Sequence, residues 1–403
     1  MVVVGGGIAG LEALLALRDL AEDRINPVLV APDAEFLYKP LAVVEPFSPE
    51  PAERRALAPI ADELGAEFIQ QAVAEVVPRA HQLRLANGET LAYDAAMVCV
   101  GGRPRPVFRQ AVSFALTPEP LEIDRILTES SQRAPQTLAF VVPPGVAWAL
   151  PLYELALLSR RRAEELGLSD LALTIVTPES SPLILFGRAA SDAVAQLLSA
   201  RDIAVRAGTL AREDPTEELI LIPGDERLEA SAVIALPRIE GPGIAGLPAD
   251  DDGFIPIDDH ARIKGVDDLY AAGDGTTFPI KQGGIGTQQA DAAAEEIAAR
   301  AGADVDPGPF RPILRGKLLT GDESLNLRGE PAGGGGEGVA SLDYLWWPPH
   351  KIGGRYLAAW LANEATRFEL EPPAHSVDVE VSLPAEWHAN PMALEPHDAP
   401  DLE

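Results

Sequence analysis

Three glycines near the start of the chain have the spacing of a loop that holds a pyrophosphate. Gly5, Gly7 and Gly10 form a G-x-G-x-x-G pattern in the segment VVVGGGIAG. A short apolar strand precedes the pattern, a helix with leucines at helical spacing follows it, and a second strand, PVLVAP, covers 27–32. In this context the first glycine permits a tight turn, the second admits a phosphate close to the backbone, and the third lets the helix pack on the strand. The segment is predicted to bind a dinucleotide.

The end of the second strand lacks the acidic residue that usually holds the ribose of such a ligand. Ala31 stands at that place. Asp33, two residues later, is a candidate for the ribose contact, because a carboxylate accepts hydrogen bonds from both hydroxyls. A solvated turn residue is an equally good interpretation of Asp33, and both stay open.

A second segment has the order of a dinucleotide fold without its glycine loop. The strand at 137–142 leads into VVPPGVAWALPLYELA (141–156), which has one glycine and three prolines. Prolines lack the backbone N–H groups that would surround a pyrophosphate, and Trp148 adds bulk. The next strand ends in TIVTP, with Glu179 just beyond it, where an acid for a second ribose would be expected. Standard NAD(P)H binding is therefore not predicted.

The elements that must position these loops repeat the order strand, helix, strand. Apolar strands are predicted at 171–178 and as a pair within 218–236, and helices at 151–166 and 283–301. This alternation favours parallel sheets covered by helices. The predicted class is α/β, with two Rossmann-like domains and a small C-terminal region.

Composition limits the classes of function. The chain has 403 residues, 47% of them hydrophobic, which is enough for two or three domains. The formal charge of -30 disfavours nucleic acid and anionic membrane surfaces as partners. A single cysteine excludes an intrachain disulfide and suits the cytoplasm. The start of the chain has no charged region or cleavage site, so no secretory signal is expected.

Two later motifs resemble those of a known superfamily. LYAAGDGTT (269–277) is similar to the second FAD motif of the two-dinucleotide-fold flavoproteins, the pyridine nucleotide-disulfide oxidoreductase superfamily. VCVGGRP (98–104) resembles the Ala-Thr-Gly turn of the same superfamily. The resemblance implies that Asp274 holds the ribityl chain of FAD, that Gly101 forms the turn, and that Cys99 is a small buried filler. It also implies two FAD/NAD(P)-binding domains of the three-layer ββα kind.

Within that superfamily three segments look most like the sulfide:quinone oxidoreductase and flavocytochrome c sulfide dehydrogenase branch, which also includes type II NADH dehydrogenases. They are FLYKPL (36–41), KQGG followed by QQ (281–289) and WWPPHKIGGRYL (346–357). The helix predicted after Gly283 would direct its positive end at the pyrimidine side of the flavin. Lys281, just ahead of it, is the candidate catalytic residue, acting through its charge on flavin or substrate.

The resemblance and the motifs together give a set of candidate site residues. FAD, held non-covalently, is predicted to contact Gly5, Gly7, Ile8, Ala9, Gly10, Asp33, Lys39, Pro40, Val73, Gly101, Arg103, Gly273, Asp274, Lys281, Gln282 and Gly283. An acceptor pocket is predicted at Gln288, Trp346, Trp347 and Lys351. For Gln288 and its neighbour Gln289 the first turn of a helix is an equally good explanation, and for the tryptophans a packed aromatic cluster is the commoner one. No metal site is predicted.

The cysteine count decides the predicted chemistry. Sulfide oxidation in this branch uses a cysteine pair beside the flavin, and one cysteine makes no pair. The predicted function is that of an FAD-dependent oxidoreductase, which moves electrons from an unidentified donor to an acceptor such as a quinone. Two alternatives stay open: an NAD(P)H:acceptor oxidoreductase of the type II NADH dehydrogenase kind, and a non-catalytic flavin-binding redox sensor.

The domain organisation follows from the same motifs. Residues 1–113 and 250–305 are predicted to form an FAD-binding domain, interrupted by a degenerate NAD(P)-binding-like domain at 114–249. Beyond them come a C-terminal region at 306–368, with a Gly-rich linker at 329–338, and an acidic tail at 369–403 with a strand at 376–381. The helix predicted at 351–367 lacks a basic polar face, so we expect it to pack on the protein or across a homodimer interface, with at most peripheral contact with a membrane.

Overall fold

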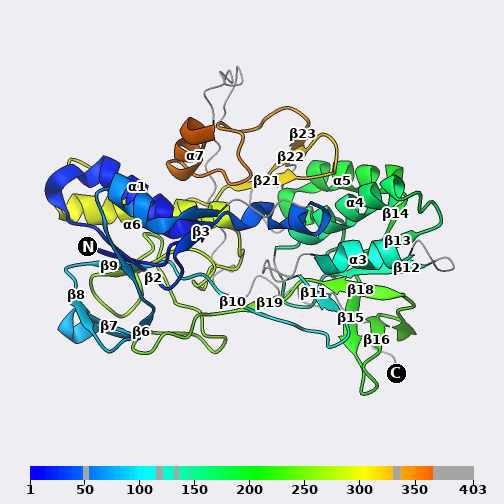
Figure 1. Cartoon of the computed structure of the whole chain (residues 1–403), viewed down its shortest axis with the longest axis horizontal. Helices are drawn as coiled ribbons and strands as arrows, with labels where there is room; N and C mark the ends of the chain where they lie inside the picture. Colours follow the sequence, from blue (N-terminus) through cyan, green and yellow to red (C-terminus); the bar gives the residue numbers. More distant parts are fainter. Residues whose placement is uncertain are drawn as a thin grey trace, which may run out of the picture.

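The computed structural model describes residues 1–48, 54–114, 121–130, 136–146, 148–329, 336 and 338–365. Most of the predicted Gly-rich linker and the whole predicted acidic tail, with its strand at 376–381, lie outside the described residues. Figure 1 shows two lobes side by side, with the C-terminal elements lying along one edge of both.

The first lobe is built on a five-stranded parallel sheet. Its order is β20 (Leu269–Ala271), β9 (Ala96–Val98), β1 (Val2–Val4), β2 (Val28–Ala31) and β5 (Glu67–Gln70). Val3 pairs with Leu29 on one side and with Met97 on the other. All three side chains are fully buried, as expected for strands covered on both faces.

Two long helices lie together on one face of this sheet. Helix α1 (Ile8–Ala21) and helix α6 (Gly283–Arg300) run side by side, although more than 260 residues separate them in sequence. Gly286 permits the approach, because a Cβ there would lie 3.0 Å from the Cα of Gly273. The predicted helix at 283–301 is thus confirmed, and its first turn is brought next to the Gly273 turn.

The second lobe repeats the design with a second five-stranded parallel sheet. Its order is β11 (Val112–Ser113), β18 (Ala232–Ala235), β12 (Thr137–Val141), β13 (Ala172–Val176) and β14 (Ile203–Arg206). The helices of this lobe are α3 (Leu121–Ser130), α4 (Leu150–Glu165) and α5 (Arg188–Ala200). Helix α4 carries Pro151 in its first turn, where the missing N–H has no helical partner to lose.

One prediction in this lobe was partly wrong. The strand pair expected within 218–236 is divided between two sheets. Strands β16 (Leu219–Ile222) and β17 (Glu226–Arg227) join β15 (Leu210–Glu213) in an antiparallel sheet, whereas β18 enters the parallel sheet. The turn between β16 and β17 contains Gly224 at a φ of 113°, a conformation that glycine adopts without strain.

The remaining elements are short. The first lobe also contains the sheets β3 (Glu35–Leu37) with β4 (Arg54–Ala56) and β6 (Val73–Val77) with β7 (Gln82–Leu85) and β8 (Thr90–Ala92), helix α2 (Leu57–Glu63), and the 3₁₀ turns η1 (Glu22–Arg24) and η3 (Pro78–Ala80). The 3₁₀ segment η2 (Lys39–Phe47) packs on helices α3 and α4 of the second lobe. The ribbon of β10 (Arg103–Arg105) and β19 (Arg238–Glu240) connects the lobes, and η4 (Ile184–Phe186) precedes α5.

The C-terminal region covers the place where the two lobes meet. It consists of the antiparallel strands β21 (Leu314–Leu318), β22 (Leu325–Gly329) and β23 (Val339–Ser341), and helix α7 (Leu357–Ala365). Helix α7 begins later than the predicted position 351, because the chain first passes through Gly353 and Gly354. It packs on α1 through Leu357 and Leu361, both buried in the core of the first lobe. Among the described helices, none combines the length and the apolar character needed to cross a bilayer.

Candidate active site

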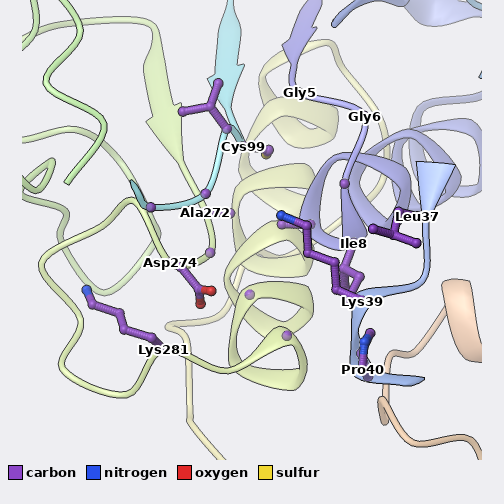
Figure 2. Close-up of a pocket in the computed structure, with 18 of the residues that line it drawn as sticks. Gly5, Gly6, Ile8, Leu37, Lys39, Pro40, Cys99, Ala272, Asp274 and Lys281 are labelled. Carbon is purple, nitrogen blue, oxygen red and sulfur yellow. The ribbon is translucent and has the colours of Figure 1, made fainter. Parts of the chain in front are cut away.

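A cavity of about 920 Å³ runs from the first glycine loop to the start of helix α4. Its walls come from many separate stretches of chain, which include the ends of β1, β2 and β9, the Gly273 turn, the start of α6, strand β21 and the segment before α7. Figure 2 shows the part of this cavity around the glycine loop and Asp274. A cavity of this size at the carboxyl ends of parallel strands is the usual position of a cofactor in such folds.

The glycine loop has the geometry that a bound pyrophosphate requires. Gly5 has a φ of 111°, and a Cβ there would lie 2.4 Å from the carbonyl oxygen of Cys99. A Cβ at Gly10 would lie 1.9 Å from the carbonyl oxygen of Gly5. Gly7 differs, since a Cβ there would meet no atom within 4 Å. The N-terminus of α1 also has no side-chain cap, so its N–H groups are left for a ligand.

Acidic and basic side chains follow the second strand at the same end of the cavity. Asp33 lines the cavity, and so does Glu35, which the sequence did not single out. Both are exposed at the rim, so either carboxylate can reach a ribose there. Lys39 extends into the cavity from the side opposite Asp274 (Figure 2). The other predicted cofactor contacts, Ile8, Ala9, Pro40, Val73, Gly101, Arg103 and Gly283, also line it.

Asp274 directs its carboxylate into the cavity. The carboxylate has no hydrogen-bond partner within the described part of the chain. Burial raises its pKa, while the charges of Lys281 and Lys39 act in the opposite direction. A carboxylate with free acceptor positions suits a ligand that presents hydroxyl groups.

Gln289, for which a place near the acceptor was one of two predicted roles, holds the turn before Asp274. Gly273 has a φ of 89°, and its N–H donates to Oε1 of Gln289 at 2.8 Å. Gln289 is completely buried on α6, with Nε2 at 3.4 Å from the hydroxyl of Thr276. Gln289 therefore positions the Asp274 turn and does not face an acceptor.

Lys281 lines the cavity, but its ammonium points away from Asp274 (Figure 2). The Nζ atom donates to the carbonyl oxygens of Thr276 and Phe278 at 2.5 and 2.8 Å and lies 3.6 Å from the ring centroid of Phe254. Burial lowers its pKa to about 8, against the charges of Asp274 and Asp250. Two of the three ammonium protons are thus used within the protein, and the predicted effect of this charge on flavin or substrate stays a prediction.

Gln282 presents an unused acceptor at the start of α6. Its Nε2 donates to the carbonyl oxygen of Arg315 at 2.7 Å. Its Oε1 is buried and has no partner among the described residues. A buried amide oxygen without a partner costs free energy unless a ligand N–H fills the place. The predicted cofactor contact of Gln282 stays a prediction, and this free acceptor is the atom that would make it.

The far end of the cavity contains a buried ion pair that the sequence did not indicate. Lys351, from the segment before α7, donates to both carboxylate oxygens of Glu154 on α4 at 2.6 Å. The Glu154 side chain is fully buried and also accepts from the N–H of Leu319 at 2.9 Å. Burial raises the pKa of Glu154, and its pairing with Lys351 counteracts the rise. Of the predicted acceptor-pocket residues, Lys351 is the one that lines the cavity.

The other three predicted acceptor residues lie elsewhere. Gln288 accepts from the N–H of Ile313 at 2.8 Å and donates to the carbonyl oxygens of Gly284 and Ile313, so its amide fixes the approach to β21. Trp346 is buried, with its indole N–H on the carbonyl oxygen of His350 at 3.0 Å. Trp347 is also not among the cavity-lining residues. An acceptor pocket built from these side chains is not supported by the structure.

The segment at 141–156, called here the rewritten loop because it has prolines where a dinucleotide loop has glycines, forms part of the wall at this end. Trp148, Leu150 and Pro151 line the cavity next to Glu154, and the Trp148 ring lies 5.6 Å from that of Phe186. The acid of the second lobe is already occupied, because Glu179 accepts from the hydroxyl of Tyr153 at 2.7 Å and from that of Thr177 at 2.9 Å. Burial raises the pKa of Glu179 to about 7.

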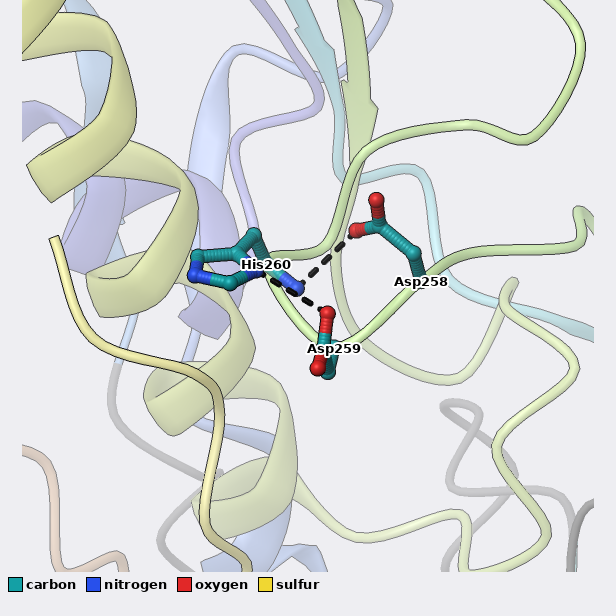
Figure 3. A group of neighbouring side chains, drawn as sticks. All are labelled: Asp258, Asp259 and His260. Atoms are coloured by element: carbon teal, nitrogen blue, oxygen red, sulfur yellow. Dashed lines mark hydrogen bonds and ion pairs between the residues drawn. The ribbon is translucent and has the colours of Figure 1, made fainter.

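A second group of polar side chains lies outside the cavity (Figure 3). Asp258, Asp259 and His260 are close enough to suggest a metal site. However, Oδ1 of Asp258 accepts from the backbone N–H groups of His260 and Arg262 at 2.9 Å each, which is an ordinary turn. His260 bonds to Asp259 at 2.9 Å, and Arg262 bonds to Glu296. The group is explained as a structural turn next to α6.

Comparisons with known proteins agree with this geometry. The sulfide-quinone reductase of Aquifex aeolicus (strain VF5) is 25% identical over 188 residues, which are 44% of this chain and 43% of that protein. The crystal structure of the sulfide:quinone oxidoreductase from Aquifex aeolicus superposes with a TM-score of 0.75 at 20% identity, covering 84% of this chain and 86% of that one. In fold, the chain is similar to proteins of the two-dinucleotide-fold flavoprotein superfamily. Within it, the chain is similar to the sulfide:quinone oxidoreductase branch.

Two further flavoprotein-fold structures are more distant. A NAD-dependent persulfide reductase from A. fulgidus gives a TM-score of 0.58 at 19% identity, covering 81% of this chain and 63% of that one. A ferredoxin reductase from Rhodopseudomonas palustris gives 0.59 at 18% identity, covering 82% and 83%. No family model matches the chain. The predicted α/β class with two Rossmann-like domains is confirmed, and so is the resemblance to this superfamily.

Proposed function

We propose that this flavoprotein-fold chain is an FAD-dependent oxidoreductase that takes electrons from a small-molecule donor and passes them to an acceptor such as a quinone. The observation that carries the proposal is the continuity of one cavity from the Gly5–Gly10 loop to the rewritten loop around Trp148. Such continuity would let a dinucleotide cofactor bound at one end meet a substrate bound at the other. A quinone acceptor is suggested by the name of the Aquifex aeolicus relative.

The residues along the cavity fit FAD in one order. The glycine loop would hold the pyrophosphate, Asp33 or Glu35 the adenosine ribose, and Asp274 the ribityl hydroxyls. The free Oε1 of Gln282 would accept from the flavin ring at the start of α6. When bound, FAD supplies the two-electron chemistry. The helix end behind Gln282 would stabilise negative charge on the ring through the positive end of its dipole.

The rewritten loop supports a donor other than a nicotinamide. Pro143 and Pro144 offer no N–H groups to a second pyrophosphate, and Trp148 occupies part of the wall where that loop would open. Glu179, the acid nearest to a second ribose, is bonded to Tyr153 and Thr177. To use Glu179 as a ribose contact, a nicotinamide dinucleotide would have to break these two hydrogen bonds. Otherwise it would bind without an acidic ribose contact.

A cysteine pair takes no part in the proposed reaction. Cys99 is the one cysteine of the chain, and it is 5% exposed beneath the glycine loop. Burial raises the pKa of its thiol to about 12, so the reactive thiolate is essentially absent at neutral pH. For the same reason we propose that FAD is held without a covalent bond. A reducing cytoplasm remains the proposed location, since a single cysteine suits it.

The Glu154–Lys351 pair gives the proposed substrate end a means of holding a proton. The pair is buried against the cavity, so a proton shared between its carboxylate and ammonium is kept away from bulk water. Oxidation of most organic donors by a flavin releases protons, and a group of this kind accepts one. Glu154 and Lys351 would accept this proton without any contact between Lys281 and the substrate.

An anaerobic titration of the purified yellow protein with NADH and then NADPH tests the proposal. We expect the flavin absorbance to stay oxidised over minutes, while a two-electron reductant such as dithionite bleaches it. Bleaching by either nucleotide within the mixing time would place the protein with the NAD(P)H dehydrogenases. A protein that holds no FAD and cannot be reconstituted would refute the whole proposal. Tight FAD with no physiological reductant would favour a redox sensor.

A further inference from the structure

The walls of the cavity carry more positive than negative charge, in a chain whose formal charge is -30. The cationic residues that line it are Lys39, Arg54, Arg103, Lys281, Arg315, Lys317 and Lys351, and the acidic ones are Asp33, Glu35, Glu154 and Asp274. A cleft of one sign with low-dielectric walls concentrates ligands of the opposite sign. The excess of positive charge therefore indicates that the cavity binds an anion. The position of the unpaired cation along the cavity decides which kind of anion that is.

Lys317 lies at the substrate end of the cavity and has no carboxylate partner among the described residues. It lies on β21, with Arg315 two residues away on the same face of the strand, since side chains alternate along a strand. No ion pair joins Lys317 to any carboxylate in the described segments. Its Nζ donates to the carbonyl oxygen of Pro349 at 3.3 Å, which satisfies one of its three protons.

The neighbouring carboxylate is already neutralised. Glu154 receives both of its short contacts at 2.6 Å from Lys351, so its charge balances Lys351 and not Lys317. Lys317 is close enough to Lys351 for its charge to lower the pKa of Lys351, and burial lowers the pKa of Lys317 itself. The group of Glu154, Lys351 and Lys317 thus carries one net positive charge, half-buried or deeper, beside the cavity. Such a charge is costly until an anion joins it.

The cofactor does not supply that anion. The phosphates of FAD would lie at the glycine loop, at the opposite end of the cavity from β21. The strand carrying Lys317 is tied instead to the start of α6, because Gln282 donates to the carbonyl oxygen of Arg315 at 2.7 Å. The ring end of the flavin therefore separates the phosphates from Lys317.

Another part of the wall at this end is apolar. Trp148, Leu150 and Pro151 border this end of the cavity, and Gly316 brings β21 close to them, since a Cβ there would lie 2.7 Å from a methyl carbon of Leu150. An ion pair formed beside these side chains is shielded from water and is stronger than one at the surface. A small organic anion suits the place better than a fully hydrated inorganic ion.

We infer that Lys317 binds the anionic group of the substrate, a small organic carboxylate held between the Trp148 wall and the Glu154–Lys351 pair. This inference rests on the proposed function, because it names the class of substrate for the same cavity. The carboxylate replaces the missing counter-charge, and the ring end of the flavin lies on the other side of it.

Calorimetric titration with benzoate and with benzamide tests the inference, because the two probes share a shape and differ in charge. The wild-type protein is expected to bind benzoate and not benzamide, with a shift in the visible flavin band. Lys317→Gln should weaken benzoate binding at least tenfold, whereas Lys317→Arg keeps the charge and retains most of the affinity. Lys264→Gln, which removes an exposed lysine outside the cavity, is the matched control and should change nothing.

Three results would overturn the inference. They are equal binding of benzoate and benzamide, unchanged benzoate affinity in a folded Lys317→Gln variant, and no binding of benzoate, acetate or glycolate tighter than about 10 mM. Calorimetry needs no flavin, so a protein that fails to retain FAD would refute the proposed function while the anion site is still measured. Circular dichroism of each variant shows that it is folded.

Discussion

Asp291 on α6 and Glu12 on α1 form a buried carboxyl pair at the base of helix α7. Glu12 accepts from the backbone N–H groups of Tyr356 and Leu357 at 2.9 and 2.7 Å, which are at the start of α7. Asp291 is hydrogen-bonded to Glu12, and burial with the adjacent Glu12 charge raises its pKa well above the usual value. Glu12 therefore remains the acceptor for the helix, and Asp291 keeps a proton.

This pair predicts that stability falls as the pH rises. The folded-state pKa of Asp291 lies above its unfolded value of about 4, so the stabilisation is complete below that value and is lost as the pH rises through the folded pKa. Asp291→Asn removes the titration and should flatten the profile. Urea unfolding of holoprotein between mildly acidic and alkaline pH measures it. The exposed Asp19→Asn on α1 is the control, and an unchanged slope in Asp291→Asn would contradict the assignment.

A second prediction concerns Gln289 and the Gly273 turn. Gln289→Leu leaves the N–H of Gly273 without its acceptor and loosens the turn that aims Asp274 into the cavity. A buried donor left unpaired costs about 1–3 kcal/mol, so FAD affinity should fall by about tenfold or more. Flavin fluorescence on dilution measures the affinity. The exposed Gln196→Leu on α5 is the matched control, and equal affinity in both variants would refute the positioning role.

The sequence predicted the part of the site that is encoded locally. Gly5, Gly7, Gly101 and Asp274 sit in short motifs whose backbone requirements are visible in the residues themselves, and all four line the cavity. Gly10 is not among the lining residues and packs against the carbonyl of Gly5 instead. Glu35 lies two residues beyond the predicted Asp33. Because the strand end lacks its usual acid, the motif does not indicate which of the two following carboxylates would contact the ribose.

The site residues that the sequence did not predict are brought together by contacts between distant segments. Glu154 and Lys351 are 197 residues apart, and nothing near either one indicates the other. The scarcity of lysine was the available signal for Lys317, since three other lysines were already assigned near the flavin. The sequence left the role of Gln288 and Gln289 open because successive residues on a helix point about 100° apart, and the packing of α6 decides which way each one faces.

A third prediction compares the contribution of the buried Glu154–Lys351 pair to stability with that of a surface ion pair. Glu154→Gln leaves the Lys351 ammonium buried without its partner, which should cost about 3–5 kcal/mol of unfolding free energy. The double variant Glu154→Gln, Lys351→Met removes both charges and should lose less than the sum of the single changes. The exposed Arg125–Glu129 pair on α3, at 2.8 Å, is the control cycle and should couple by no more than about 0.5 kcal/mol. Similar coupling in the two cycles would refute the proposed burial.

The last prediction distinguishes two glycines of the same loop. Gly7→Val places its side chain in open space on the cavity side, where a Cβ meets no atom within 4 Å, so the apoprotein should fold with a loss of only about 1 kcal/mol, because valine is a poorer helix N-cap than glycine. Its FAD affinity should fall by about a hundredfold, because the methyl groups occupy the place of the pyrophosphate. Gly10→Ala should lose more stability than Gly7→Val, since its Cβ would lie 1.9 Å from the carbonyl oxygen of Gly5. Thermal unfolding of the apoproteins and FAD titration measure both effects, and normal FAD binding by Gly7→Val would show that the cofactor does not lie on this loop.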